Sequence, residues 1–156
     1  MKEEIHRYLL SVDEKGFWEF PQSGRWDVPF EEVVSIKPDL EKITGVFLDI
    51  DKNVQDASFL TDLGLLDDRY YDREKGCGAI SYLFSIRFSN FGRMFTVFGS
   101  DWPENKSKYS LEEAIKYLEE RKYKYIPENE LHEPYDGINK PFEPDLSWWV
   151  RYFDYL

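Results

Sequence analysis

The sequence is poor in the residues that build metal centres and disulfide frameworks. Among 156 residues it has one cysteine, Cys77, and two histidines, His6 and His132. A single cysteine allows neither an intrachain disulfide nor a cysteine-based zinc site. His132-Glu133 begins like a zinc-protease motif, but Asp136 stands where the second histidine is required. We therefore expect no metal site and no cofactor.

Long apolar segments are missing as well. No segment approaches the ~20 apolar residues that a membrane-spanning helix needs. Even the most apolar stretch, residues 79–98, is interrupted by Arg87, Asn90 and Arg93. Residues 1–8 contain no apolar run of signal-peptide length. These observations predict a soluble, cytoplasmic protein that does not bind membranes.

Positive charge is in deficit, with 20 Lys and Arg against 31 Asp and Glu and a formal net charge of −11. Contacts to phosphates need Lys and Arg, so this balance argues against nucleic acid and against anionic membrane surfaces as partners. The chain is nevertheless 42% hydrophobic and 18% aromatic, unlike disordered acidic tails. Its length fits one globular domain covering residues 1–156.

Recognisable catalytic motifs are absent too. There is no G-x-S-x-G nucleophile elbow, and residues 76–78 are too short for a phosphate-binding loop. Cys77, between two glycines, is interpreted as a small buried residue. Residues 49–53 have the first spacings of a calcium-binding loop. However, Val54 replaces the turn glycine and Leu60 replaces the bidentate glutamate. We therefore expect that this protein is not an enzyme.

Periodicity predicts the elements of the fold. Apolar alternation or β-branched content predicts strands at residues 5–12, 26–30, 43–50 and 148–153, and a hairpin over 79–98 with its turn at 89–92. The last strand places at least one of Trp148 and Trp149 in the core. Ser110 and Glu113 form a capping-box pattern before an apolar stripe, which predicts a helix through Lys122.

Weaker patterns complete the prediction. The spacing of apolar residues predicts a short helix over 56–63 that ends near Gly64, whereas 31–36 fits either a helical turn or a continued strand. Residues 67–74 and 125–144 are predicted to be loops. Together these elements predict an α+β fold with a mostly antiparallel sheet and helices packed on one face.

Acidic residues concentrate around tyrosines in two segments. The first comprises Asp67, Asp68, Tyr70, Tyr71, Asp72 and Glu74; the second comprises Glu128, Glu130, Glu133, Tyr135 and Asp136. Tyrosine is favoured in interfaces, and surrounding carboxylates steer a basic partner toward them. A solvated acidic face that keeps the protein soluble is the competing interpretation. We predict that the partner is bound by all the named residues of the first segment and by four residues of the second, Glu130, Glu133, Tyr135 and Asp136.

A small, acidic, aromatic-rich and cysteine-poor chain of this kind resembles bacterial immunity proteins. The resemblance is one of composition, and no functional residue is carried over from it. It implies a cytoplasmic inhibitor that binds a basic, nuclease-like toxin domain in a 1:1 complex and covers its active-site cleft or an adjacent exosite.

Two other classes of function remain open. One is a protein that binds a carbohydrate or another small ligand in a pocket lined by Trp and Tyr, with or without catalysis by paired carboxylates. The other is a scaffold that self-associates.

Overall fold

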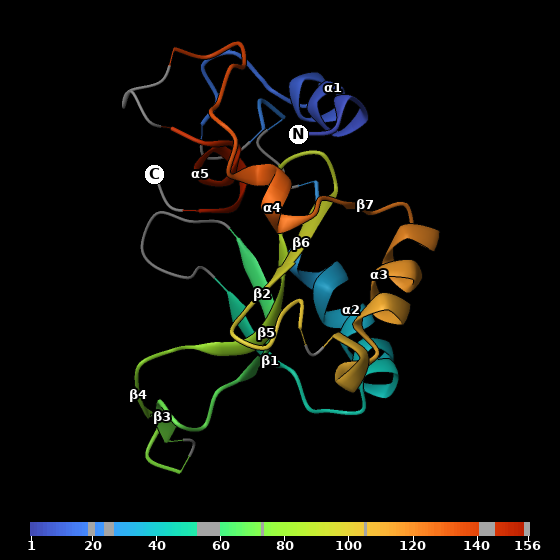
Figure 1. Ribbon diagram of the computed structural model, residues 1–156, viewed down its shortest axis with the longest axis vertical. Coiled ribbons are helices and arrows are strands. Elements are labelled where there is room, and N and C mark those ends of the chain that lie inside the picture. Colours follow the sequence, from blue (N-terminus) through green and yellow to red (C-terminus); the bar gives the residue numbers. More distant parts are fainter. Residues whose placement is uncertain are drawn as a thin grey trace.

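A mixed sheet lies at the centre of the computed structural model, which describes residues 1–18, 21–23, 27–52, 60–72, 74–104, 106–140 and 146–154. Within these residues five strands form it, in the order β1-β2-β5-β6-β7 (Figure 1). They are β1 (Asp49–Lys52), β2 (Thr61–Leu66), β5 (Tyr82–Phe88), β6 (Met94–Phe98) and β7 (Lys124–Tyr125). Neighbours are antiparallel except β6 and β7, which are parallel.

The hairpin predicted over residues 79–98 is confirmed as β5 and β6. Ile86 pairs with Val97, and Phe88 pairs with Phe95. These four side chains are buried on the same face of the sheet, as the period-two pattern requires. Gly92 adopts a left-handed conformation in the connecting turn, with a φ of 65°.

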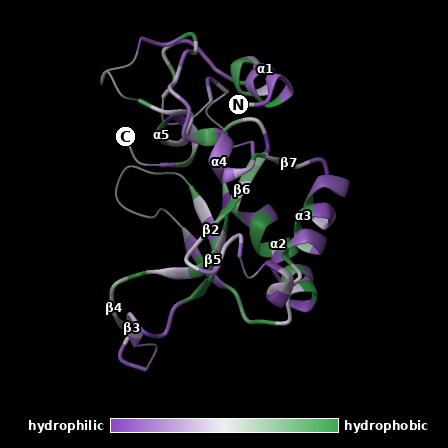
Figure 2. Cartoon of the chain, in the orientation of Figure 1, coloured by the Kyte–Doolittle hydropathy of each residue, from purple (hydrophilic) through white to green (hydrophobic). Residues whose placement is uncertain are grey.

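Two helices cover this face: α2 (Phe30–Thr44) and α3 (Leu111–Glu120). Figure 1 shows both on the same side of the sheet, and in Figure 2 hydrophobic and hydrophilic residues are mixed along the strands. Leu40 of α2, Leu118 of α3 and Phe84 of β5 are fully buried in the resulting core. The predicted α+β class is therefore confirmed.

The predicted helix after Ser110 is confirmed as α3, which follows the short 3-10 helix η1 (Lys106–Tyr109). Leu111, Ala114 and Leu118 form its buried face. Ser110 itself has a φ of 47°, and its side chain makes no capping hydrogen bond. The apolar stripe, rather than the capping box, therefore accounts for this helix.

Three further helices gather around a second core at one end of the molecule (Figure 1). They are α1 (Glu3–Ser11), α4 (Glu128–Leu131) and α5 (Trp148–Phe153); with residues 12–18 and 132–139 we name them the helical cap. Leu9, Leu131, Trp148 and Phe153 are buried within it. None of the described helices is both long enough and apolar enough to cross a lipid bilayer.

Buried ion pairs attach α5 to the rest of the molecule. Arg151 donates to Asp13 Oδ1 from Nε at 3.0 Å and from Nη2 at 2.8 Å, and both side chains are fully buried. Arg87 of β5 binds both oxygens of Asp62 at 2.7 Å and donates from Nη1 to the carbonyl oxygen of Phe153 at 2.8 Å. The helix thus lies against the sheet face opposite α2 and α3.

The strands predicted at both ends of the chain are wrong. Residues 5–12 are mostly in α1, where Ile5 and Leu9, four residues apart, are buried on one helical face while Leu10 is exposed. Residues 148–153 form α5, with burial at positions 148, 151, 152 and 153. Apolar alternation resembled a strand, but the buried positions follow helical spacing. Trp148 is nevertheless in the core, as predicted.

Three internal predictions also need correction. The strand predicted at 43–50 is wrong at 43–48, because α2 continues to Thr44 and ends at the left-handed Gly45, and β1 begins only at Asp49. Residues 31–36, which fitted either a helical turn or a strand, are helical. The strand predicted at 26–30 is wrong at Phe30, which begins α2, and Trp26 lies outside the described residues. The helix predicted over 56–63 is wrong at 61–63, which belong to β2; 56–59 lie outside the described residues.

The two predicted loops contain short regular elements. Within 67–74, Tyr71–Asp72 form β3, which pairs with β4 (Cys77–Gly78) in a separate two-stranded sheet. Within 125–144, α4 interrupts the loop, whose residues 141–144 lie outside the described part of the chain. Both predicted acidic segments are thus more ordered than expected.

Candidate functional site

Residues 67–72 and 74–81, between β2 and β5, project from the body of the molecule; we name them the arm (Figure 1). Asp67 N donates to Ser81 O at 2.8 Å where the arm leaves the sheet, and Ala79 N donates to Tyr70 O at 3.0 Å farther out. Gly78 has a φ of 131°, and a Cβ there would lie 2.2 Å from Tyr70 O. The close approach of the two strands therefore requires glycine at this position.

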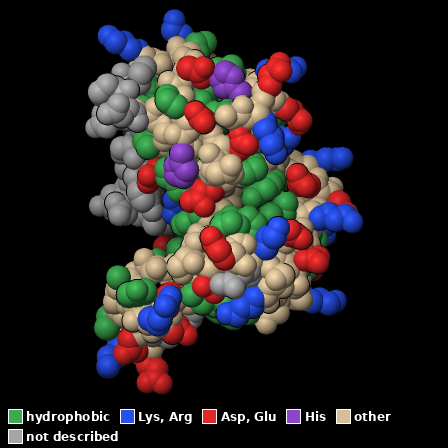
Figure 3. Space-filling view, in the orientation of Figure 1, with side chains coloured by type: hydrophobic (Ala, Val, Ile, Leu, Met, Phe, Trp, Pro, Cys, Tyr) green, Lys and Arg blue, Asp and Glu red, His purple; other side chains and the backbone are tan. Residues whose placement is uncertain are grey.

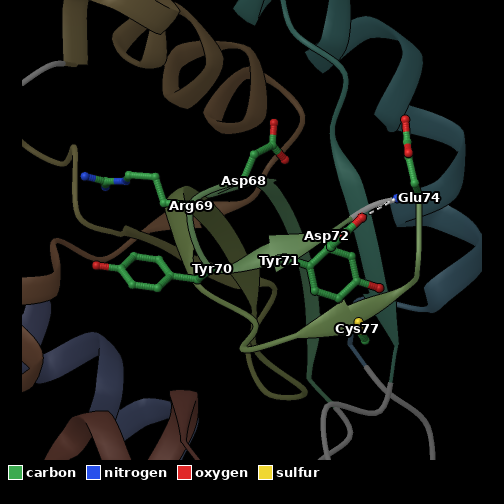
Figure 4. A pocket seen from close by; sticks show the side chains of 7 residues that line it. All are labelled: Asp68, Arg69, Tyr70, Tyr71, Asp72, Glu74 and Cys77. Atoms are coloured by element: carbon green, nitrogen blue, oxygen red, sulfur yellow. Dashed lines mark hydrogen bonds between the residues drawn. The ribbon is translucent and has the colours of Figure 1, made fainter.

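The arm carries an open hollow of about 450 Å³, lined by Asp68, Arg69, Tyr70, Tyr71, Asp72, Glu74 and Cys77. In Figure 4, Arg69 and Tyr70 point to one side of the hairpin, whereas Tyr71 lies on the other side near Cys77. The lining side chains thus diverge instead of converging on one point. This geometry suits a surface that docks against a partner better than a cavity that encloses a small ligand.

Large apolar groups on the arm are exposed to water. The exposed fraction is 56% for Tyr70 and 57% for Ile80. Figure 2 shows a hydrophobic stretch beside β4 in an otherwise hydrophilic arm, and in Figure 3 hydrophobic, acidic and basic side chains are neighbours there. Sequence reasoning missed Ile80, because its place in an apolar alternation assigned it to a buried strand.

Basic residues of the arm neutralise part of its acidity. Arg69 Nε donates to Asp67 Oδ1 at 2.8 Å, and Lys75 Nζ donates to Asp72 Oδ2 at 2.9 Å. These hydrogen bonds lower the pKa of Asp67 and of Asp72 below the ordinary value of an aspartate. Both carboxylates are therefore ionised at neutral pH. Cys77 is exposed, so its interpretation as a small buried residue is wrong.

The second predicted acidic segment borders a different hollow, in the helical cap. This hollow of about 490 Å³ is lined by Met1, Glu3, His6, Glu133, Pro134, Asp136 and Trp148. His6 Nε2 lies 2.8 Å from Asp136 Oδ1. Glu133 and Asp136 are exposed, as predicted for contact residues, and Figure 3 shows acidic and histidine side chains on the cap. No local pattern in the sequence predicts that Glu3 and His6 lie beside them.

Three of the predicted partner-binding side chains are buried and serve the fold. Asp67 is 2% exposed, and Glu130, 9% exposed, accepts a hydrogen bond from Lys2 N at 2.6 Å. Tyr135 is 8% exposed; its hydroxyl donates to Asp13 and accepts from Asn139 N at 2.9 Å. The prediction that these three contact a partner directly is corrected by their burial.

The remaining predicted residues are divided between two distant places. Asp68, Tyr70, Tyr71, Asp72 and Glu74 lie on the arm, whereas Glu133 and Asp136 lie on the cap at the opposite end of the molecule (Figure 1). One compact surface containing both segments is therefore excluded in this conformation. Among the described residues, no group of three or more His, Cys, Asp or Glu is arranged to hold a metal ion.

Comparisons with protein-family models, curated proteins and solved structures found no match to this chain.

Proposed function

We propose that this protein is a non-catalytic binding protein whose arm docks on a basic protein partner. The observation that carries the proposal is the pair of exposed apolar side chains, Tyr70 and Ile80, on a projecting hairpin. Tyrosine is enriched among the residues that dominate binding energy. Covering Tyr70 and Ile80 with a partner removes apolar surface from water, which favours association.

The charges near these side chains indicate the kind of partner. Asp68 and Glu74 are exposed on the arm, and Asp72 is held in its ionised form. Carboxylates around an apolar centre accelerate association with a basic surface and discourage an acidic one. A projecting hairpin with this chemistry fits the cleft of a basic, nucleic-acid-cleaving domain, where the carboxylates occupy the place of phosphates. The role is that of a bacterial immunity protein in the cytoplasm.

A binding site for a carbohydrate or another small ligand is the second candidate. It is favoured by the hollow of about 450 Å³ with Tyr70 and Tyr71 in its lining. Sugar binding needs aromatic faces and polar groups that converge on the ligand. Because Tyr70 and Tyr71 point to different sides of the hairpin (Figure 4), the docking surface has the stronger support.

The experiment compares three tagged full-length proteins in the host that carries the gene: the natural sequence, Tyr70→Ala and Phe47→Ala. Phe47 is the matched control, because it is an aromatic residue with an exposed fraction of 64% outside both candidate surfaces. We expect the natural protein and Phe47→Ala to bind the same basic protein in a 1:1 complex. Tyr70→Ala should bind it about 30-fold more weakly, the effect of losing about 2 kcal/mol at an interface hot spot.

Calorimetry with the purified partner measures these affinities, and growth of cells that express the partner measures protection. Equal binding by all three proteins would show that the arm is not the docking surface. Capture of only acidic proteins, or of a small ligand, would contradict the proposed class of partner.

A further inference from the structure

Asp67 lies where the arm joins β2, and its backbone organises this junction. Its amide donates to Ser81 O at 2.8 Å, and its carbonyl oxygen accepts from Tyr70 N at 3.0 Å and from Tyr71 N at 3.3 Å. The residue is only 2% exposed although its side chain is a carboxylate. It is therefore placed to act on neighbouring residues and not on a partner.

The side chain of Asp67 is directed to a single residue, Arg69. Its Oδ1 accepts from Arg69 N at 3.0 Å and from Nε at 2.8 Å, and its Oδ2 accepts from Nε at 2.9 Å and from Nη2. The hydrogen bonds and the negative charge of Asp67 raise the pKa of the Arg69 guanidinium, and Asp101, in the loop after β6, adds a smaller effect in the same direction. The guanidinium is thus fixed, although the Arg69 side chain is 66% exposed.

Fixing Arg69 also affects Tyr70. The Arg69 guanidinium carbon lies 5.6 Å from the centre of the Tyr70 ring, within the range of a cation–π contact. Figure 4 shows the two side chains extending in the same direction from the hairpin. Together they present an aromatic ring and a planar guanidinium whose positive charge is already balanced by Asp67.

We propose that Asp67 is a positioning residue, which holds the side chains of Arg69 and Tyr70 in their binding conformation before the partner is bound. Arginine and tyrosine are, with tryptophan, the side chains enriched at interface hot spots, and ordering them before binding reduces the entropy lost on association. The surface that they form fits a flat apolar or aromatic patch of a basic protein. The consequence for binding rests on the proposed function; the ordering of the arm does not.

The ordering is tested without any partner by nuclear magnetic resonance of the full-length protein. Asp67→Asn is compared with Asp39→Asn, which removes the same charge from an exposed ion pair with Arg121 on another part of the surface. In Asp67→Asn we expect faster exchange of the Arg69 Nε proton. Backbone order parameters at Tyr70 and Tyr71 should fall from about 0.85 toward 0.6.

Asp39→Asn should leave these signals unchanged. Unchanged order and exchange in Asp67→Asn would overturn the positioning role, whatever the partner is. If Asp67→Asn does not fold, Arg69→Gln breaks the same ion pair by changing its exposed member. Unchanged backbone order at Tyr70 in that variant would also overturn the positioning role.

A double-mutant cycle with the basic partner tests the consequence for recognition. We expect Asp67→Asn to weaken binding about tenfold in the natural background, because two side chains must then be ordered on association. In the Arg69→Gln background it should have little further effect. An equal loss in both backgrounds would show that Asp67 acts through the arm backbone instead, and would leave the proposed function standing. Absence of any basic partner would defeat the proposed function, while the resonance experiment still decides the positioning role.

Discussion

The arm and the helical cap contain similar residues but use them in opposite ways. In the arm, ion pairs join residues close in sequence, such as Asp67 with Arg69 and Asp72 with Lys75, and the charged groups of Arg69 and Lys75 face water. In the cap, Asp13 and Arg151 are 138 positions apart, and both are fully buried. The arm pairs shape a local surface, whereas the cap pair connects distant segments of the chain.

This difference separates stability from recognition. Asp13 also accepts hydrogen bonds from Ile138 N at 2.8 Å and from Asn139 Nδ2 at 3.0 Å, so one carboxylate joins three segments of the cap. In the described part of the arm, the ion pairs of Asp67 and Asp72 join residues only two and three positions apart. We therefore expect the arm to open without disturbing the cores. Acidic residues of the cap can therefore be essential without touching any partner.

The largest expected effect is the loss of the buried pair in the cap. Asp13→Asn leaves the charge of Arg151 buried without its counter-ion, and we expect the free energy of unfolding to fall by about 3–5 kcal/mol. Urea denaturation followed by tryptophan fluorescence measures the change. Asp72→Asn, which breaks an exposed arm pair, is the control and should have a much smaller effect. Similar losses in the two variants would refute the contrast between arm and cap.

The same contrast explains which parts of the fold could be predicted from sequence. The β5–β6 hairpin and α3 follow from local periodicity alone, because their apolar residues lie on one face of a single element. α5 could not be predicted this way, since one of its buried side chains is Arg151 and its partner Asp13 is near the other end of the chain. The burial of an arginine depends on a tertiary contact that no local pattern contains.

Prediction of the candidate site was limited by the same problem. Sequence reasoning found the acidic residues and tyrosines of the arm, because composition is visible in a short window. It could not distinguish the exposed Tyr70 from the buried Tyr135, since burial depends on packing against Trp18 and Trp148. It also could not show that the arm projects, because its two-residue strands have no detectable period.

An intermediate effect, confined to the arm, is expected from Gly78→Ala. Alanine at a φ of 131° is strained, and its Cβ would clash with Tyr70 O. Strain of about 1–3 kcal/mol should open the hairpin and speed hydrogen exchange of the Ala79 amide at least about tenfold. The midpoint of global unfolding should change little.

Gly76→Ala is the matched control for this substitution. Gly76 also has a positive φ, of 61°, but a Cβ there meets no atom within 4 Å. The amide of Ala79 should therefore remain better protected in Gly76→Ala than in Gly78→Ala. A global destabilisation by Gly78→Ala as large as that by Asp13→Asn would mean that the arm is integrated with the cores.

The smallest expected effects concern pH, and they have opposite signs in the two regions. In the cap, burial raises the pKa of Glu128 above its ordinary value of 4.5, against a smaller opposing effect of His132. The folded state then binds a proton more tightly than the unfolded state, so ionisation of Glu128 costs stability as pH rises through its folded pKa. In the arm, Lys75 lowers the pKa of Asp72 below 3.8. Asp72 therefore contributes stability above pH 3.8, which is lost as pH falls through its folded pKa.

Urea unfolding of Glu128→Gln and Asp72→Asn across the pH range tests this difference in sign. Relative to the natural protein, Glu128→Gln should be equally stable below pH 4.5 and more stable near pH 7, because it removes a partly buried charge that lacks full compensation. Asp72→Asn should be less stable near pH 7, and the difference should disappear in strong acid. If both variants changed the free energy of unfolding in the same direction at pH 7, the carboxylates of the arm and of the cap would have the same electrostatic role. The contrast between the two regions would then apply to packing and not to charge.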